Sequence, residues 1–147
     1  MTAIPTPSTR INSINTRLAD LTAFVTVIAA AVIRLIDVGG IPHYIDNAYP
    51  IWQALLIADR GIFPVIGQMS SAGIPNPPLT AYLYLPIVAL TRSPLAVYVV
   101  VIVLNALAVG FGYLLGKRLF NPGAGLLVAV LMAVNPWLIE YSRFTWV

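Results

Sequence analysis

The side chains of this sequence that could take part in chemistry are few, and Asp46 stands out among them. It lies in Ile41–Pro50, which reads IPHYIDNAYP and follows the first long apolar run. Only 9% of the residues are charged against 59% hydrophobic, so a carboxylate that faces water is scarce here. Such a carboxylate can take a proton from a hydroxyl group as a general base. The structural alternative is that Asp46 or Asn47 caps the helix that follows, with Pro50 in its first turn.

The remaining candidates are Glu140 and His43. His43 is the single histidine, which argues against a zinc site made of protein ligands. It is either a base or metal ligand, or a solvated loop residue. The sequence contains no cysteine, so it offers no disulfide, no thiolate metal site and no cysteine nucleophile. Whether a divalent metal takes part is left open.

The elements that must position these residues are expected to lie in or on a membrane. A mean hydropathy of +0.88 is too high for a surface that faces water, so we expect an integral membrane protein of the all-α class. The net charge of +3 fits basic cytoplasmic loops. No basic patch interleaved with aromatic residues occurs, which excludes a nucleic-acid-binding surface.

The first expected elements are a tail and a membrane span. Met1–Arg17 is polar and basic and predicts a disordered cytoplasmic tail, followed by a span over Leu18–Leu35. A cleaved signal peptide is the alternative, disfavoured by the polar residues that follow closely and by the later apolar segments. Arg34 and Asp37 are three residues apart on a helix and are expected to pair.

Two helices are expected to lie at the outer membrane surface. In Pro50–Arg60 the apolar side chains share one helical face and Gln53 lies off it, and Gly61 ends the helix. A loop over Phe63–Asn76 leads to a second helix over Leu79–Thr91, with Asn76 as its cap. Both helices are shorter than the roughly 20 residues that a span requires.

The basic residues decide the expected topology. If Leu79–Thr91 does not cross the membrane, the next apolar segment, Leu95–Gly116, runs inward and places Lys117 and Arg118 in the cytoplasm with the basic tail, as the positive-inside rule prefers. Gly125–Leu138 is then a third span, bent at Pro136 and ending outside. We therefore expect three spans, a cytoplasmic amino terminus and a multi-pass plasma-membrane location.

Small and polar residues in the second span predict helix packing. Asn105, Gly112 and Gly116 have the types and the spacing that allow helices to approach closely. After the third span, Glu140 and Arg143 are expected at the same outer surface as Asp46. The aromatic residues around them predict an interfacial belt.

The order of these features resembles a known family. A span ending in Arg34 and a loop with Asp46 are followed by NPPLTAYLYLP, LLGKRLFNPGAGLL and NPWLIEYSRF. This order is similar to the amino-terminal part of C-type-fold membrane glycosyltransferases, which include dolichyl-phosphate-mannose protein mannosyltransferases and aminoarabinose transferases. The likeness covers about Arg34 to Arg143. It implies that residues 18–147 are the amino-terminal part of a multi-span domain that continues through further helices.

The resemblance also implies an activity and its residues. Members transfer a sugar from a polyprenyl-phosphate donor to an acceptor outside the cytoplasm, and Asp46 matches the acidic residue that activates or positions the acceptor hydroxyl. Arg143 matches an arginine suited to a phosphate. The expected substrate-binding residues are Arg143, Tyr49, His43, Asn76 and Glu140. The chain departs from the pattern at Asn47, where many relatives have a second acidic residue, and at Asn76, where a basic residue is frequent.

Two functions of different classes are therefore expected to compete. The first is a polyprenyl-phosphate-sugar-dependent glycosyltransferase of which this chain is one part, inactive alone, whose acceptor is an unspecified protein, lipid or glycan. The second is a small non-catalytic membrane subunit that packs against larger partners through Asn105 and the glycines. A transporter ranks lower, because no ionisable residue falls at mid-membrane.

Overall fold

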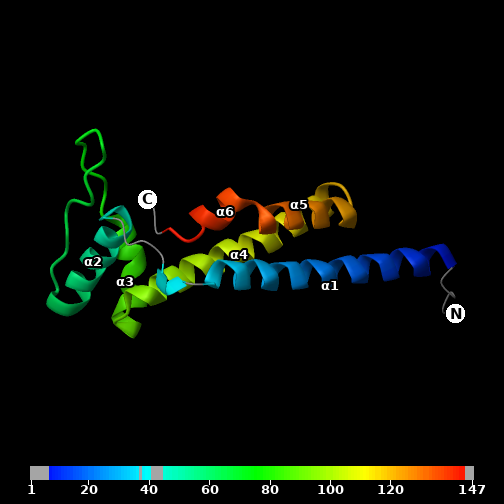
Figure 1. Cartoon of the computed structure of the whole chain (residues 1–147), viewed down its shortest axis with the longest axis horizontal. Coiled ribbons are helices and arrows are strands. Elements are labelled where there is room, and N and C mark those ends of the chain that lie inside the picture. Colours follow the sequence, from blue (N-terminus) through cyan, green and yellow to red (C-terminus); the bar gives the residue numbers. More distant parts are fainter. Residues whose placement is uncertain (1–6, 37, 41–44, 145–147) are drawn as a thin grey trace, which may run out of the picture. The chain divides into compact units, whose positions relative to one another are not determined.

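The computed structural model describes residues 7–36, 38–40 and 45–144, with backbone only for residues 7–15 and 45. The elements are α1 (Pro7–Leu35), the 3-10 helix η1 (Val38–Gly40), α2 (Ile45–Arg60), α3 (Leu79–Thr91), α4 (Pro94–Leu119), α5 (Pro122–Val134) and α6 (Pro136–Tyr141) (Figure 1). Within the described residues every regular element is a helix, which confirms the all-α class. The chain divides into two compact units, Met1–Arg34 with Val103–Ile139 and Leu35–Ile102 with Glu140–Val147.

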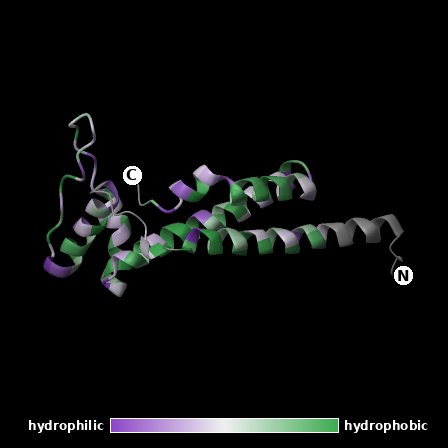
Figure 2. Ribbon diagram, in the orientation of Figure 1, coloured by the Kyte–Doolittle hydropathy of each residue, from purple (hydrophilic) through white to green (hydrophobic). Residues whose placement is uncertain are grey.

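Among the residues that the structure describes, two helices are long and apolar enough to cross a membrane. These segments are Thr16–Leu35 of α1 and Pro94–Leu119, the whole of α4. Only 17% and 28% of their most apolar windows are buried, less than expected for core helices of a water-soluble protein. Figure 2 shows the apolar residues along both helices. The first two expected spans therefore coincide with helices of suitable length and composition.

The third expected span, Gly125–Leu138, is not one continuous helix. α5 ends at Val134, Asn135 is extended with φ −63° and ψ 118°, and α6 begins at Pro136. Proline has no N–H for the carbonyl four residues earlier and disfavours helical geometry in the residue before it. The expected bend at Pro136 is thus a complete interruption, and α5 has 13 residues, fewer than a straight span needs.

The amino-terminal tail also differs from the expectation of disorder through Arg17. α1 begins at Pro7, and residues 1–6 lie outside the described part of the chain. Proline is well suited to the first turn of a helix, and neither glycine nor another proline follows before Leu35. Helix extension from the apolar segment costs little once that segment is helical, so the polar residues from Pro7 can continue it.

The first unit has a core of small residues. Alanines of α1 and α5 pack with α4 in one buried cluster: Ala23, Ala30, Val109, Tyr113, Ala129 and Ala133. Gly125 of α5 lies so close to α4 that a Cβ there would be 2.5 Å from the Tyr113 carbonyl oxygen and 2.8 Å from the Lys117 nitrogen. A Cβ on Gly116 would lie 2.8 Å from the Cα of Gly125. The predicted close packing of α4 is confirmed at its glycines, and α5 is the partner.

Substitution of Gly125 tests this contact. We expect Gly125→Ala to destabilise the chain by about 1–3 kcal/mol, because the added methyl group meets backbone atoms that cannot rotate away. Gly110→Ala is the control, since a Cβ there would lie 3.4 Å from the Val27 side chain, an ordinary contact. Unfolding of both variants in detergent, followed by circular dichroism, measures the difference. Equal stability of the two variants would contradict the close approach.

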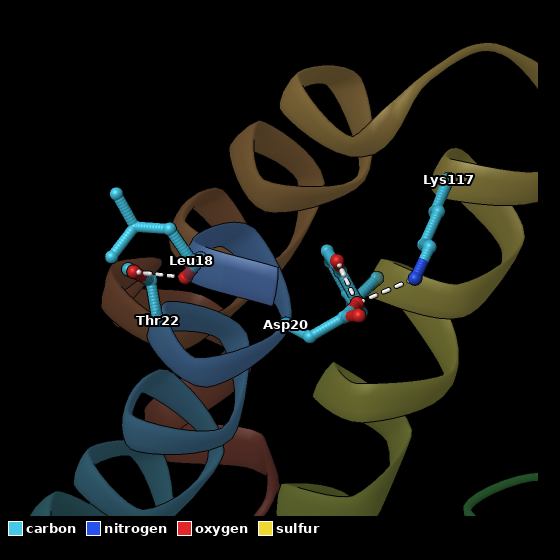
Figure 3. A network of polar contacts seen from close by, with 5 residues as sticks. Leu18, Asp20, Thr22 and Lys117 are labelled. Atoms are coloured by element: carbon cyan, nitrogen blue, oxygen red, sulfur yellow. Dashed lines mark hydrogen bonds and ion pairs between the residues drawn. The ribbon is translucent and has the colours of Figure 1, made fainter. Parts of the chain in front are cut away.

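A polar cluster joins α1 to the end of α4 in the same unit (Figure 3). The Asp20 Oδ1 atom accepts hydrogen bonds from the Tyr113 hydroxyl and from Lys117 Nζ, each at 2.5 Å. Lys117 Nζ also lies 5.6 Å from the centre of the Tyr113 ring, within range of a cation–π interaction. Asp20 therefore has a partner on another helix.

Arg34, near the end of α1, is 2% exposed and bonds to main-chain oxygens. Its Nη1 donates to the carbonyls of Ala30 at 3.1 Å and Ala133 at 3.3 Å, and its Nη2 donates to the Met132 carbonyl at 3.1 Å. In a continuous helix the Met132 carbonyl would accept a hydrogen bond from the N–H of residue 136. Residue 136 is proline and has no N–H. Arg34 thus replaces the missing donor at the end of α5. The expected partner, Asp37, lies outside the described residues.

The second unit packs α2 and α3 against each other and against the first turns of α4. The buried cluster consists of Ile51, Ala54, Tyr84, Val88, Val97, Tyr98 and Ile102. Burial raises the pKa of the Tyr84 phenol, with a smaller contribution from Tyr98, so its hydroxyl stays protonated. The expected apolar face of α2 is partly wrong, because Gln53 is buried and Trp52 is exposed.

Candidate functional site

The candidate site is a cleft in the second unit, between the start of α2, the loop after it and the start of α3. Its volume is about 400 Å³. Its lining residues are Asp46, Pro50, Gln53, Gly67, Gln68, Met69, Ser70, Ser71, Asn76, Pro77, Pro78, Thr80 and Ala81. The lining combines one carboxylate with six amide or hydroxyl side chains and with apolar residues, and no lysine or arginine belongs to its described part. Such walls suit a neutral group rich in hydroxyls better than a phosphate.

α2 places Asp46 in this cleft. The helix begins at Ile45, five positions before the expected start, so Asp46 lies in its first turn and not in a preceding loop. Pro50 is accommodated inside the helix, close to its start, where a missing N–H affects only the carbonyl of Asp46. The Asp46 side chain is exposed and its Oδ1 accepts a hydrogen bond from Gln68 Nε2. Asp46 is thus a residue of the helix itself, and its side chain bonds to the loop. Both observations disagree with the alternative that Asp46 caps the helix.

A small hairpin in the loop positions Gln68. The Gly67 N–H donates to the Asn76 carbonyl at 2.8 Å, and the Asn76 N–H donates to the Gln68 carbonyl at 2.9 Å. Gly73 has a φ of +73°, which other residues rarely adopt. A Cβ on Gly67 would lie 2.7 Å from the Pro77 carbonyl oxygen, so only glycine fits this approach. These two glycines fix the hairpin and thereby the position of Gln68, which bonds to Asp46.

Two other polar side chains of the cleft form hydrogen bonds with the main chain of the loop. Gln53 is 4% exposed, and its Nε2 donates to the Ile66 carbonyl at 2.9 Å, which ties the loop to α2. The Ser70 hydroxyl oxygen accepts from the Ile74 N–H at 3.1 Å. Thr80 is buried at the start of α3. An entering hydroxyl group would therefore find one exposed carboxylate among donors and acceptors that the fold already holds.

Asn76 is the only other expected site residue that the structure places in the described cleft lining. It belongs to the hairpin and does not cap α3, whose N-cap is Pro78 without a side-chain hydrogen bond. Tyr49 lies on α2 outside the described lining, and its ring centre is 5.7 Å from that of Trp52. His43 lies outside the described residues.

Glu140 and Arg143 also lie outside the described lining of the cleft. Arg143 Nη2 donates to the Ile36 carbonyl, and its N–H donates to the Glu140 carbonyl at 3.1 Å. Glu140 is exposed. Neither residue is in the cleft, so a shared site with Asp46 stays a prediction. Among the described residues no three His, Asp or Glu side chains gather to hold a metal ion.

The comparisons with known proteins give no family. No protein-family model matches the chain, and neither a curated protein nor a solved structure matches it. The geometry of the cleft is therefore the basis for any assignment of function.

The sequence did not indicate Gln53, Gln68, Ser70, Ser71 or Thr80. Gln53 was expected to lie off the apolar face of its helix. A buried amide side chain can, however, donate a hydrogen bond to a carbonyl that would otherwise be unpaired. The hairpin residues follow no periodic pattern. Gln68 among them bonds to Asp46, which lies 22 residues earlier in the sequence. The one usable signal was the spacing of Gly67 and Gly73 around polar residues, which is typical of a tight turn.

Proposed function

We propose that this chain is the amino-terminal portion of a membrane glycosyltransferase that uses a polyprenyl-phosphate sugar. The observation that carries the proposal is the exposed Asp46 carboxylate in a cleft whose polar lining otherwise consists of amide and hydroxyl side chains. The order of sequence features that resembles the C-type glycosyltransferases supports it. The test is whether membranes that contain the complete enzyme transfer the sugar, and whether this transfer depends on Asp46.

In this proposal Asp46 acts on the acceptor. An acceptor hydroxyl enters the cleft, donates a hydrogen bond to Asp46, and loses its proton to the carboxylate as the sugar carbon bonds to its oxygen. The bond from that carbon to the phosphate oxygen breaks, and the polyprenyl phosphate leaves with the bonding electrons. Gln68 holds the carboxylate at the cleft by its hydrogen bond. Binding of the phosphate is assigned to groups outside the cleft, because its described lining carries no cationic side chain.

The alternative of a non-catalytic subunit receives no support from its expected interface. That interface included Gly112 and Gly116 of α4. A Cβ on Gly112 would lie 2.6 Å from the Met132 sulfur, and one on Gly116 would meet Gly125, so α5 of the same chain occupies this surface. A partner protein would have to use another face.

The proposed topology places the cleft outside and the end of α4 in the cytoplasm. Cysteines introduced at Ser71 and Arg118 test it, since both side chains are exposed and the sequence has no cysteine of its own. In sealed right-side-out vesicles we expect an impermeant maleimide to label the Ser71→Cys variant at once. It should label Arg118→Cys only after permeabilisation. Labelling of both variants from one side would refute the proposed topology.

A further inference from the structure

The loop between α2 and the hairpin carries a concentration of exposed apolar side chains. These residues, 62–66, read IFPVI and are called the apolar loop below. Val65 is 89% exposed, Phe63 is 63% exposed, and Ile62 and Ile66 are each more than half exposed. Exposed apolar surface that is contiguous in this way marks a site of interaction with a membrane or a protein.

The charge pattern around the apolar loop favours a lipid partner. No Asp, Glu, Lys or Arg occurs between Arg60 and Arg92, so the loop, the hairpin and α3 are entirely uncharged. Charged residues are costly below the headgroups of a bilayer, whereas aromatic residues are enriched at the level of the headgroups. Phe63 stacks on Tyr82 of α3 with ring centres 6.4 Å apart, which supplies such an aromatic pair.

Chain connectivity also keeps the loop near a membrane. α1 precedes this segment and α4 follows it, and both are long and apolar enough to span. If both cross, the described residues between them lie on one side of the bilayer, tethered to its surface at both ends. The partner nearest to the apolar loop is then the bilayer that α1 and α4 occupy.

Two side chains of the same unit reduce the cost of taking the loop backbone out of water. An unpaired carbonyl is costly in an apolar medium. The Tyr82 hydroxyl donates to the Pro64 carbonyl at 2.7 Å, and Gln53 Nε2 donates to the Ile66 carbonyl at 2.9 Å. Pro64 has no N–H to leave unpaired. The apolar loop therefore presents side chains outward while some of its backbone groups are already bonded.

We propose that the apolar loop inserts into the boundary between headgroups and acyl chains of the bilayer. Inserted there, it holds the start of α2 and the hairpin at the membrane surface, so that the Asp46 cleft opens at headgroup depth. The proposal rests on the membrane location in the proposed function and not on glycosyl transfer. Either can therefore fail without the other.

Spin labels on single cysteines test the insertion in the full chain reconstituted into phosphatidylcholine vesicles. Collisions with oxygen, which concentrates in lipid, are compared with collisions with a nickel chelate that stays in water. Val65→Cys is the test variant. Leu104→Cys, exposed on α4, is the reference for lipid, and Arg60→Cys and Ser71→Cys are the references for water.

The expected result is a ratio of oxygen to nickel collisions at Val65 several-fold above that at Arg60 and Ser71, and near that at Leu104. A ratio at Val65 equal to that at Arg60 would overturn the insertion. Low collision rates with both reagents would also overturn it, because they indicate burial against protein. If Leu104 itself behaves as a water site, the membrane location fails together with the proposal. Circular dichroism of each variant confirms that its helices are retained.

Discussion

In the complete enzyme of which this chain is proposed to be the amino-terminal portion, replacement of Asp46 by asparagine is expected to reduce sugar transfer by roughly 100- to 10,000-fold, the usual contribution of a general base. An amide cannot take the acceptor proton, although its oxygen can still accept the hydrogen bond that Gln68 donates to Asp46. The helix loses an acidic residue from its first turn, which costs about 0.3–1 kcal/mol. Transfer rate and thermal melting, measured on the same membrane preparation, separate the two effects.

Asp59→Asn is the matched control for this experiment. Asp59 lies near the end of the same helix, where it pairs with Arg92, and both side chains are about half exposed. An exposed pair of this kind contributes no more than about 1 kcal/mol, so transfer should remain near normal. Near-normal transfer by the Asp46 variant, or a loss that only follows its loss of folded protein, would remove Asp46 from the mechanism.

Loss of the Arg34 side chain is expected to have the largest effect on stability. Arg34→Met retains much of the side-chain length but leaves the Met132 carbonyl without the donor that replaces the absent N–H of Pro136. Hydrogen bonds to charged groups and buried groups left unpaired are each worth up to about 3 kcal/mol, so we expect a loss of about 3 kcal/mol. Unfolding of the detergent-solubilised chain by dodecyl sulfate, followed by circular dichroism, measures it. Arg118→Met, at an exposed position, should stay within about 0.5 kcal/mol of the original.

A second substitution identifies the cause of this loss. Pro136→Ala restores an N–H at the position that normally serves the Met132 carbonyl. Arg34→Met should therefore cost less in the Pro136→Ala background than alone, by an interaction free energy of about 0.5–3 kcal/mol. Additive effects of the two substitutions would show that Arg34 stabilises the chain without serving that carbonyl.

The sequence predicted the elements that have continuous apolar runs with clear ends. The bounds of α3, Leu79–Thr91, coincide with the expected helix, and α4 extends the expected span by only a few residues at its ends. Asn121, directly before Pro122, is a residue type that favours the N-cap position, and its side chain accepts from the Ala124 N–H at 2.9 Å. Local signals of this kind depend on neighbouring residues and can therefore be read without the fold.

The errors came from contacts between distant segments. Pro50 was taken for the start of α2, but the helix includes Ile45 and Asp46 ahead of it. Gln53 is buried because a loop carbonyl needs its amide, and no pattern within α2 contains that information. No local pattern indicates that Arg34 donates to carbonyls 98 and 99 residues away. The position of Asp46 could be noticed from sequence, but its cleft could not.

The partners of α1 have a consequence for the synthesis of the protein. Asp20 pairs with a lysine 97 residues later in the chain, and Arg34 bonds to carbonyls at a similar distance. At about 5–20 residues per second, a ribosome needs on the order of 5–20 s to supply these partners. During that time α1 carries a carboxylate and a guanidinium without their final bonds. If α1 crosses a membrane, as proposed, the nascent helix is therefore least stable in the bilayer before α4 and α5 have been synthesised, and these two helices then complete its polar contacts.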